Sequence, residues 1–226
     1  MTSLIHDLAH VTVRQVAVGD MDNNVYLITA KASGAQVLID AADDLPALQA
    51  LLAEGAADSG APTKLELIAT THQHWDHVRA LEGLVEATGA RTAAGRQDVS
   101  GIPVPVDVVL DHGDVYTCGE VSAGAQEHGG FDLTAVHLRG HTPGSIAYVL
   151  KDDDGPHLIF SGDSLFPGGV GNTQKDPDRF HLLIGDVITR LFDVYPDDAV
   201  VYPGHGRPTT LGAERPHLDD WRARGW

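Results

Sequence analysis

The segment THQHWDH, residues 71–77, places three histidines and one aspartate within six consecutive positions. Its ligand-type side chains are His72, His74, Asp76 and His77. Zinc-type ions bind imidazole nitrogen and carboxylate oxygen together, and histidine is the commonest metal ligand in proteins. With 13 histidines in 226 residues, the pattern His-x-His-x-Asp-His is expected by chance in only about half a per cent of such chains. The segment therefore predicts a metal site.

Three further ligand-type residues stand on short turns that are rich in small residues. His141 lies in RGHTPGS, Asp163 in FSGDS and His205 in YPGHG, and each turn follows an apolar run that is typical of a strand. Any one of them alone could be a structural residue. Their shared place at strand ends favours function, because functional groups of α/β folds concentrate on such loops.

Short strands and helices alternate along the chain and would position these turns. Asp43 or Asp44 can cap a helix with Pro46 in its first turn, and a helix is expected from His77 to about Thr88. The runs at 22–24 (Asp-Asn-Asn) and 151–156 (KDDDGP) predict turns. We expect α/β layers around two sheets, with strands at 11–16, 25–29, 36–39, 65–69, 115–118, 133–138, 146–150, 158–161 and 200–202 and a last helix at about 177–192.

Composition favours one globular domain and argues against nucleic-acid and membrane partners. No stretch approaches the about 20 apolar residues that a membrane helix needs, and the first ten residues lack the features of a secretory signal. The net charge of −17 argues against nucleic acid, because binding to phosphates depends on Lys and Arg. Cys118, the single cysteine, agrees with a reducing compartment and should be a buried apolar residue. We therefore expect a cytoplasmic protein without nucleic-acid or membrane partners; the sequence leaves its oligomeric state open.

The sequence resembles the metallo-β-lactamase fold superfamily, and in particular its short, single-domain glyoxalase II-like metallohydrolases. The motifs THQHWDH, GHTPGS, SGDSLF and YPGHG occur in the order found in that group. The resemblance implies a four-layer αββα sandwich formed by one domain over residues 1–226, with the metal site at one edge of the two sheets. It also implies that Asp40 lies beneath the metal loop.

The resemblance further implies a ligand set. His72, His74 and His141 would bind a first metal, Asp76, His77 and His205 would bind a second, and Asp163 would bridge them. Two divalent ions, zinc or else iron or a zinc and iron pair, would share a hydroxide that attacks a carbonyl. Asp76 would also act in catalysis by orienting the water or carrying a proton.

Several activities are open at this stage. The leading hypothesis is hydrolysis of an acyl thioester, a 2-hydroxyacyl conjugate of a low-molecular-weight thiol. The alternatives are a persulfide dioxygenase with one iron on His72, His141 and Asp163, a lactonase, and a non-catalytic metal-stabilised binding module. A β-lactamase is disfavoured because secreted enzymes of that kind usually carry a cysteine among the ligands, and the corresponding position here is Asp163. Only about twenty residues follow His205, so we do not expect the helical domain of full-length glyoxalase II, and the thiol stays open.

Substrate contacts are expected from the glycine-containing loop 166–180. Lys175 and Arg179 could bind a substrate carboxylate there. The hairpin around residues 21–24 is a further candidate wall of the site.

Overall fold

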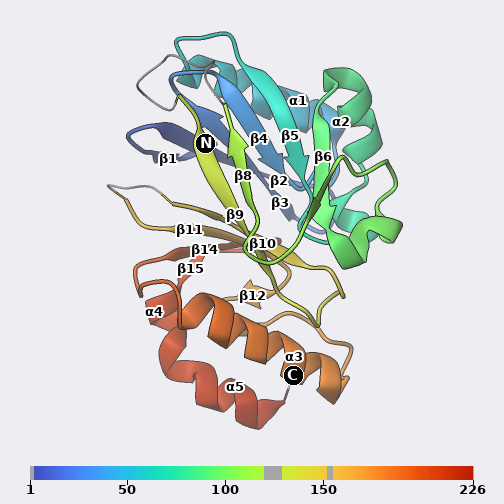
Figure 1. Cartoon of the computed structure of the whole chain (residues 1–226), viewed down its shortest axis with the longest axis vertical. Helices are drawn as coiled ribbons and strands as arrows, with labels where there is room; N and C mark the ends of the chain where they lie inside the picture. The colour runs from blue at the N-terminus through green and yellow to red at the C-terminus, as the bar shows by residue number, and fades with distance from the viewer. Residues whose placement is uncertain (1–2, 120–128, 152–154, 226) are drawn as a thin grey trace.

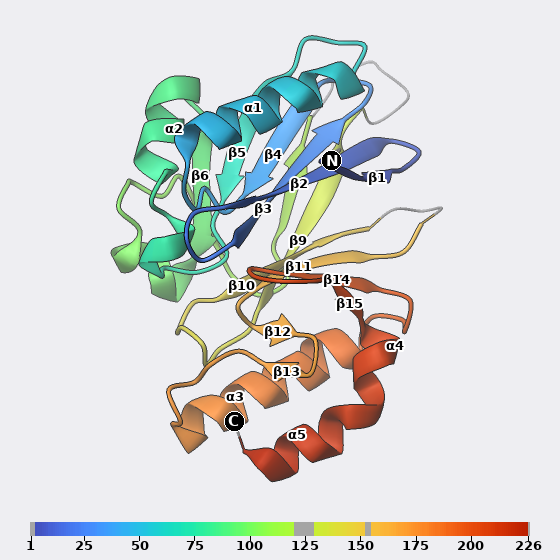
Figure 2. The same ribbon diagram turned by 180° about the vertical axis from the view of Figure 1, so that it is seen from behind.

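Two β-sheets packed face to face form the centre of the molecule, and helices cover their outer faces (Figures 1 and 2). The structure, a computed structural model, describes residues 3–119, 129–151 and 155–225. One hydrophobic cluster lies between the sheets, a second lies under the helices of the first sheet, and a third lies under those of the second. The chain thus has the four-layer αββα sandwich that the sequence predicts.

The first sheet has the strand order β1-β2-β3-β4-β5-β6-β7. Neighbours pair antiparallel from β1 to β4 and parallel from β4 to β7. The helix α1 (Leu45–Gly55) begins where the Asp44 side chain accepts a hydrogen bond from Ala47 N, with Pro46 in its first turn as predicted. The strands are β1 (Leu4–Asp7), β2 (Val11–Val18), β3 (Asn23–Ala30), β4 (Ala35–Ile39), β5 (Lys64–Ala69), β6 (Arg91–Gly95) and β7 (Val108–Leu110).

The second sheet has the order β15-β14-β11-β10-β9-β8. Its outer face is covered by α3 (Pro177–Val187), which continues into a π-helical turn at Ile188–Phe192, and by α4 (Leu211–Glu214) and α5 (Leu218–Arg224). The strands are β8 (Val115–Cys118), β9 (Phe131–His137), β10 (Ile146–Leu150), β11 (Leu158–Gly162), β14 (Val200–Pro203) and β15 (Thr209–Thr210), and β12 (Leu165–Phe166) pairs separately with β13 (Gly169–Val170).

All the predicted strands are confirmed, but two predictions about connections are wrong. The helix expected from His77 is instead a 3-10 turn, Trp75–His77, and α2 (Leu81–Thr88) begins four residues later. The turn closes through His77 N donating to His74 O, which keeps the ligand-type side chains together before the helix starts. The Asp-Asn-Asn run is not the hairpin turn, because Asn23 and Asn24 already pair with β2.

Three other predictions concern features around this frame. Cys118 is fully buried in the cluster between the sheets, as expected. Residues 152–154 of the predicted KDDDGP turn lie outside the described residues; β10 and β11, which flank them, pair antiparallel. Within the described ranges, no helix has the length and apolar character that crossing a membrane requires.

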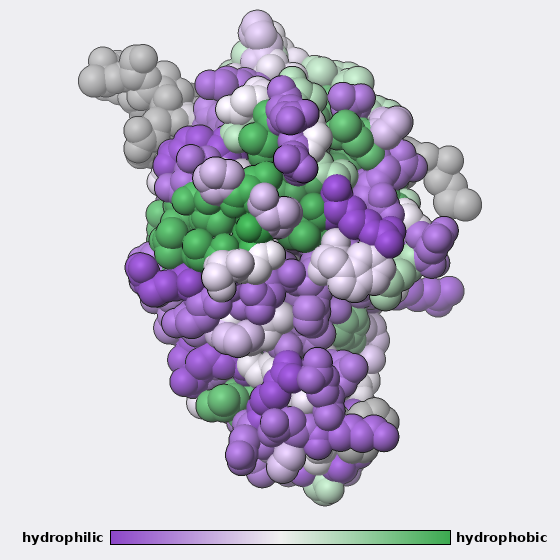
Figure 3. Space-filling view, turned by 90° about the vertical axis from the view of Figure 1, so that its right-hand side faces the viewer, coloured by the Kyte–Doolittle hydropathy of each residue, from purple (hydrophilic) through white to green (hydrophobic). Residues whose placement is uncertain are grey.

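Hydrophobic and hydrophilic side chains are unevenly distributed on one side of the molecule. On the face that contains α2, at the right of Figure 1, hydrophobic side chains gather in a band across the upper half (Figure 3). The lower half of this face is mainly hydrophilic. The second sheet's helices therefore present a polar surface on this side.

Candidate metal centre

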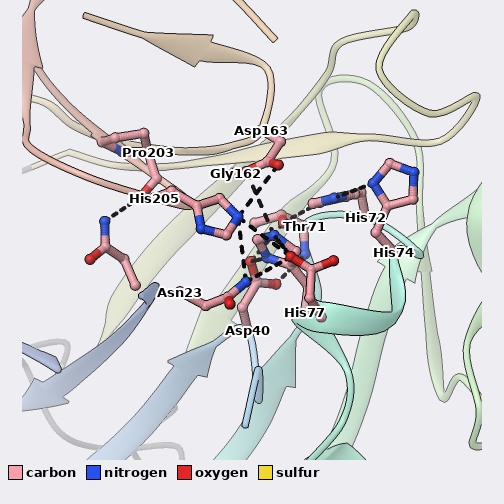
Figure 4. Close-up of polar contacts among 12 residues, drawn as sticks. Asn23, Asp40, Thr71, His72, His74, His77, Gly162, Asp163, Pro203 and His205 are labelled. Carbon is pink, nitrogen blue, oxygen red and sulfur yellow. Dashed lines mark hydrogen bonds and ion pairs between the residues drawn. The ribbon is translucent and has the colours of Figure 1, made fainter. Parts of the chain in front are cut away.

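All seven predicted ligand residues meet at one edge of the sandwich, where strands of both sheets end. Figure 4 shows His72, His74, His77, Asp163 and His205 at this edge. The ligand-type atoms within each group lie within 4.8 Å of one another, and the groups are His72, His74 and His141; His72, His77 and Asp163; and Asp76, His77 and His205. Seven other histidines that the structure describes lie outside these groups, and the remaining one, His128, is not among the described residues.

Three ring nitrogens converge in the first group. His74 Nδ1 lies 3.0 Å from both His72 Nε2 and His141 Nε2. His74 Nδ1 can carry only one proton, so it can donate to only one of these two nitrogens. Across the other contact, two lone pairs face each other unless a cation lies between them. Burial and then the neighbouring histidines hold the pKa of His72 well below its usual value. The group thus brings together imidazole nitrogens that are suited to a cation.

The outer nitrogens of two of these rings are fixed by hydrogen bonds. The hydroxyl of Thr71 donates to Asp40, so it accepts from His72 Nδ1 at 3.0 Å. His141 Nδ1 donates to the carbonyl of Asn172 at 2.8 Å. Both bonds leave Nε2 as the acceptor that points into the site, which is how metal-binding histidines are usually oriented.

The second group contains carboxylates as well as rings. Asp76 Oδ2 lies 3.5 Å from His77 Nε2 and 3.4 Å from His205 Nε2. Asp163 Oδ1 lies 3.6 Å from His77 Nε2, and its Oδ2 lies 3.7 Å from His205 Nε2. Ligands at 2.0–2.2 Å from a tetrahedral ion are themselves about 3.3–3.6 Å apart, which these distances match.

Two buried atoms of this region have no hydrogen-bond partner. They are His77 Nε2 and Asp163 Oδ1. An orphaned buried polar atom is costly, and the great majority of such atoms in native proteins are satisfied. Asp163 Oδ2 also lies 3.6 Å from His141 Nε2, so this carboxylate faces both groups. The donor set therefore fits divalent metal ions.

Asp40 supports the site from below, as the sequence resemblance implied. This aspartate is buried and has a left-handed backbone, with φ +59°. It accepts hydrogen bonds from Thr71 N and Thr71 Oγ1, each at 2.7 Å, and from His77 Nδ1 at 2.8 Å. Burial lowers the pKa of His77, but the charges of Asp40, Asp163 and Asp76 outweigh it and raise that pKa to about 9. The second group thus attracts positive charge.

The hairpin between β2 and β3, which the sequence analysis named as a candidate wall of the site, contributes a supporting residue that it did not single out. Asn23 Nδ2 donates to Asp76 Oδ2 at 3.0 Å, and Met21 O accepts from His205 Nδ1 at 3.0 Å. Burial works against the charged form of Asp76, yet this bond and nearby histidines leave its pKa below the usual value. Two adjacent asparagines were the only local signal, and they were interpreted as a turn.

The two predicted substrate-binding residues lie in different cavities. Arg179 lines a cavity of about 570 Å³ beside His74 and His141, where its Nε donates to Gly140 O at 2.8 Å. Lys175 lines a separate cavity of about 330 Å³. Gln174 and Lys175 both have a left-handed backbone, with φ 59° and 60°. Strain of this kind is often kept at functional sites.

Known proteins resemble this chain along most of its length. A hydroxyacylglutathione hydrolase of Cereibacter sphaeroides is 32% identical over 184 residues, which are 81% of this chain and 62% of the relative. The chain thus spans about three fifths of that relative's length. The hydroxyacylglutathione hydrolase GloC of Haemophilus influenzae is 29% identical over 67% of this chain and 73% of its own.

A solved structure of TTHA1623 in a di-iron-bound form is 30% identical to this chain, with a TM-score of 0.65. The match covers 89% of this chain and 96% of that one. The family model for the metallo-beta-lactamase superfamily matches residues 18–205, a range that includes every ligand-type residue of the site. The chain therefore belongs to the metallo-beta-lactamase superfamily.

Proposed function

We propose that this protein is a dinuclear metal-dependent hydrolase of acyl thioesters. The observation that carries the proposal is the position of Asp163, whose two oxygens face two groups of ligand-type atoms. The substrate class is supported by the names of two relatives, both hydroxyacylglutathione hydrolases. We propose a 2-hydroxyacyl conjugate of a low-molecular-weight thiol as substrate.

The ligand assignment follows the two outer groups. His72, His74 and His141 would hold one divalent ion, and Asp76, His77 and His205 the other, with Asp163 bound to both. We propose zinc, with iron or a zinc and iron pair as alternatives; the di-iron form of the similar TTHA1623 is consistent with two sites. When bound, the ions supply positive charge that polarises the substrate carbonyl and makes water acidic enough to attack near neutral pH.

Asp76 is the residue that we propose for proton transfer. Its pKa lies below the usual value, so it is ionised and accepts hydrogen bonds at neutral pH. Asn23 occupies Oδ2 and fixes the plane of the carboxylate. A carboxylate held in this way can orient a water molecule and take up its proton.

Arg179 would bind a carboxylate of the substrate. Two of its nitrogens are held by the carbonyls of Gly140 and His141, and Nη1 has no partner among the described residues. The side chain lines the cavity that also contains His74 and His141, so a substrate whose carbonyl lies over the ligand residues can reach it. Lys175, in its own cavity, would contact a more distant part of the substrate.

The test combines metal content with turnover. Protein purified without metal-capturing tags should contain about two ions per chain by mass spectrometry, and it should release thiol from 2-hydroxyacyl thioesters of glutathione and other small thiols. His72→Ala should abolish turnover with the fold retained, whereas His10→Ala, at an exposed histidine outside the site, should not.

Other outcomes would replace the proposal. One iron per chain, retained in His77→Ala, with oxygen uptake on a thiol persulfide would identify a dioxygenase. Turnover of lactones but not of thioesters would identify a lactonase. Metal binding without any turnover would leave only a binding module.

A further inference from the structure

A buried aspartate outside the ligand set joins two loops of the metal centre. Asp98 lies in a 3-10 segment, Arg96–Gly101, which follows β6, and its exposed fraction is 0%. Its Oδ2 accepts from Gln73 N at 3.0 Å and from Thr142 Oγ1 at 2.6 Å. Its Oδ1 accepts from Gly144 N at 2.7 Å. No lysine, arginine or histidine forms an ion pair with it among the described residues, so three neutral donors hold a buried charge.

Two of these three donors, Gln73 and Thr142, are direct neighbours of ligand residues in the sequence, and Gly144 lies three positions after His141. Gln73 lies between His72 and His74, and Thr142 follows His141. The histidines come from two loops, yet their ring nitrogens meet at 3.0 Å. Asp98 is therefore bonded within one residue of every histidine of the first group.

The 3-10 segment is packed against both loops at backbone distance. A Cβ on Gly144 would lie 2.4 Å from Asp98 N, and a Cβ on Gly95 would lie 2.0 Å from Gly144 O. A Cβ on Gly101 would lie 2.0 Å from the Gln73 side chain. Little space is left for the loops to move relative to the segment, so the carboxylate can fix their separation.

The second group is supported by different residues. His77 is held by Asp40, Asp76 by Asn23, and His205 by the carbonyl of Met21. None of these supports is hydrogen-bonded to Asp98. A change at Asp98 should therefore reach one group and spare the other.

We infer that Asp98 is a positioning residue that sets the spacing of the first ligand group. Its loss should weaken metal binding at His72, His74 and His141. Metal binding at Asp76, His77 and His205 should stay unchanged. The inference rests on the ligand assignment proposed above and not on the reaction. Hydrogen-bonded residues behind metal ligands typically change metal affinity by about 10- to 100-fold when they are altered.

Replacing Asp98 by asparagine keeps the size of the side chain, so it tests the hydrogen bonding of the carboxylate and not the space that it fills. An amide has one acceptor oxygen, whereas Asp98 uses both of its oxygens. In one orientation the amide NH₂ group faces Gln73 N–H, and in the other it faces Gly144 N–H. Either way one loop loses its bond and meets a donor instead, so the two loops are no longer tied together.

The experiment measures zinc affinity of the metal-free protein by competition with a chromophoric chelator. Asp98→Asn is made in two backgrounds: His77→Ala, which leaves the first group intact, and His74→Ala, which leaves the second. We expect affinity to fall about tenfold or more in the first background and less than twofold in the second. Asp58→Asn is the matched control, because Asp58 also accepts three hydrogen bonds, in its case from the side chains of Thr12 and Arg14, away from the centre.

A second pair of variants covers the case in which Asp98→Asn fails to fold. Thr142→Val removes one bond to Asp98 and should weaken the same ion, whereas Thr142→Ser keeps the hydroxyl and should retain its affinity. Equal losses in both backgrounds would mean a general structural role and would overturn the inference, as would unchanged affinity in both. Selective loss of zinc in a protein that hydrolyses no thioester would refute the proposed reaction and leave the role of Asp98 intact.

Discussion

Replacing Asp40 by asparagine tests how the support beneath the metal centre acts. Asparagine, like aspartate, tolerates a left-handed backbone, so φ +59° should be kept. The change removes the charge behind His77 and one of the two acceptor oxygens. A hydrogen bond to a charged group contributes about 1.5–3 kcal/mol, which corresponds to about 10- to 150-fold in zinc affinity.

The size of this loss should depend on pH. Asp40 attracts the proton on His77 as well as the metal ion, and the two compete below the raised pKa of about 9. Part of the loss therefore cancels at neutral pH, and the full loss should appear at about pH 9.5. Competition titrations with a chelator at both values measure it.

The matched control is Asp44→Asn. Asp44 also has a left-handed backbone, with φ 50°, but it caps α1 and does not contact a ligand residue. Asparagine caps helices as well as aspartate does, so zinc affinity should be unchanged. An Asp40→Asn protein that binds zinc within twofold of the native protein at pH 9.5 would refute the reasoning.

Three further predictions concern the centre and its surroundings. Because His77 has a pKa of about 9 and must lose its proton to bind metal, zinc per chain should rise towards two between about pH 6 and 9, as equilibrium dialysis would measure. Gly204→Ala would place a methyl group 2.4 Å from Asp163 Oδ1 and should abolish metal binding. Gly185 lies in α3, and a methyl group there would meet nothing within 4 Å. Gly185→Ala should therefore raise the free energy of unfolding by about 0.5–1 kcal/mol in denaturant titrations. Cys118 is fully buried, and burial followed by the nearby Glu66 raises its pKa, so a thiol reagent should modify it only after denaturation.

The ligand-type residues could be found from the sequence because their signals are local. The histidine segment is defined by spacing within seven residues, and each remaining ligand type stands on a small-residue turn after an apolar strand. The strands were found because their apolar runs are short and bounded by turn residues. Spatial convergence needs the fold, and the resemblance to a known family supplied it.

The supporting residues could not be found in this way. Asn23 acts on Asp76, 53 positions away, and Asp98 acts on Thr142, 44 positions away. Neither the Asn23 and Asn24 pair nor a lone aspartate identifies such a partner in the sequence. The predicted helix start at His77 was also wrong. The segment that carries the ligand-type residues, and not helix propensity, decides the backbone conformation there.

The two ligand groups meet the same requirement by opposite means. In the first group, burial lowers the pKa values of His72 and His141, so these two rings do not hold a proton that competes with a metal ion. The three histidines of this group bring no negative charge that would attract a cation, so binding depends on the spacing of their nitrogens. The carboxylate of Asp98, which is hydrogen-bonded to both loops, maintains that spacing. The second gathers carboxylates around His77 and gains electrostatic attraction, but the same charge retains a proton that a metal ion must displace. Loss of a support should therefore appear as a change in spacing in the first group and as a change in pH dependence in the second.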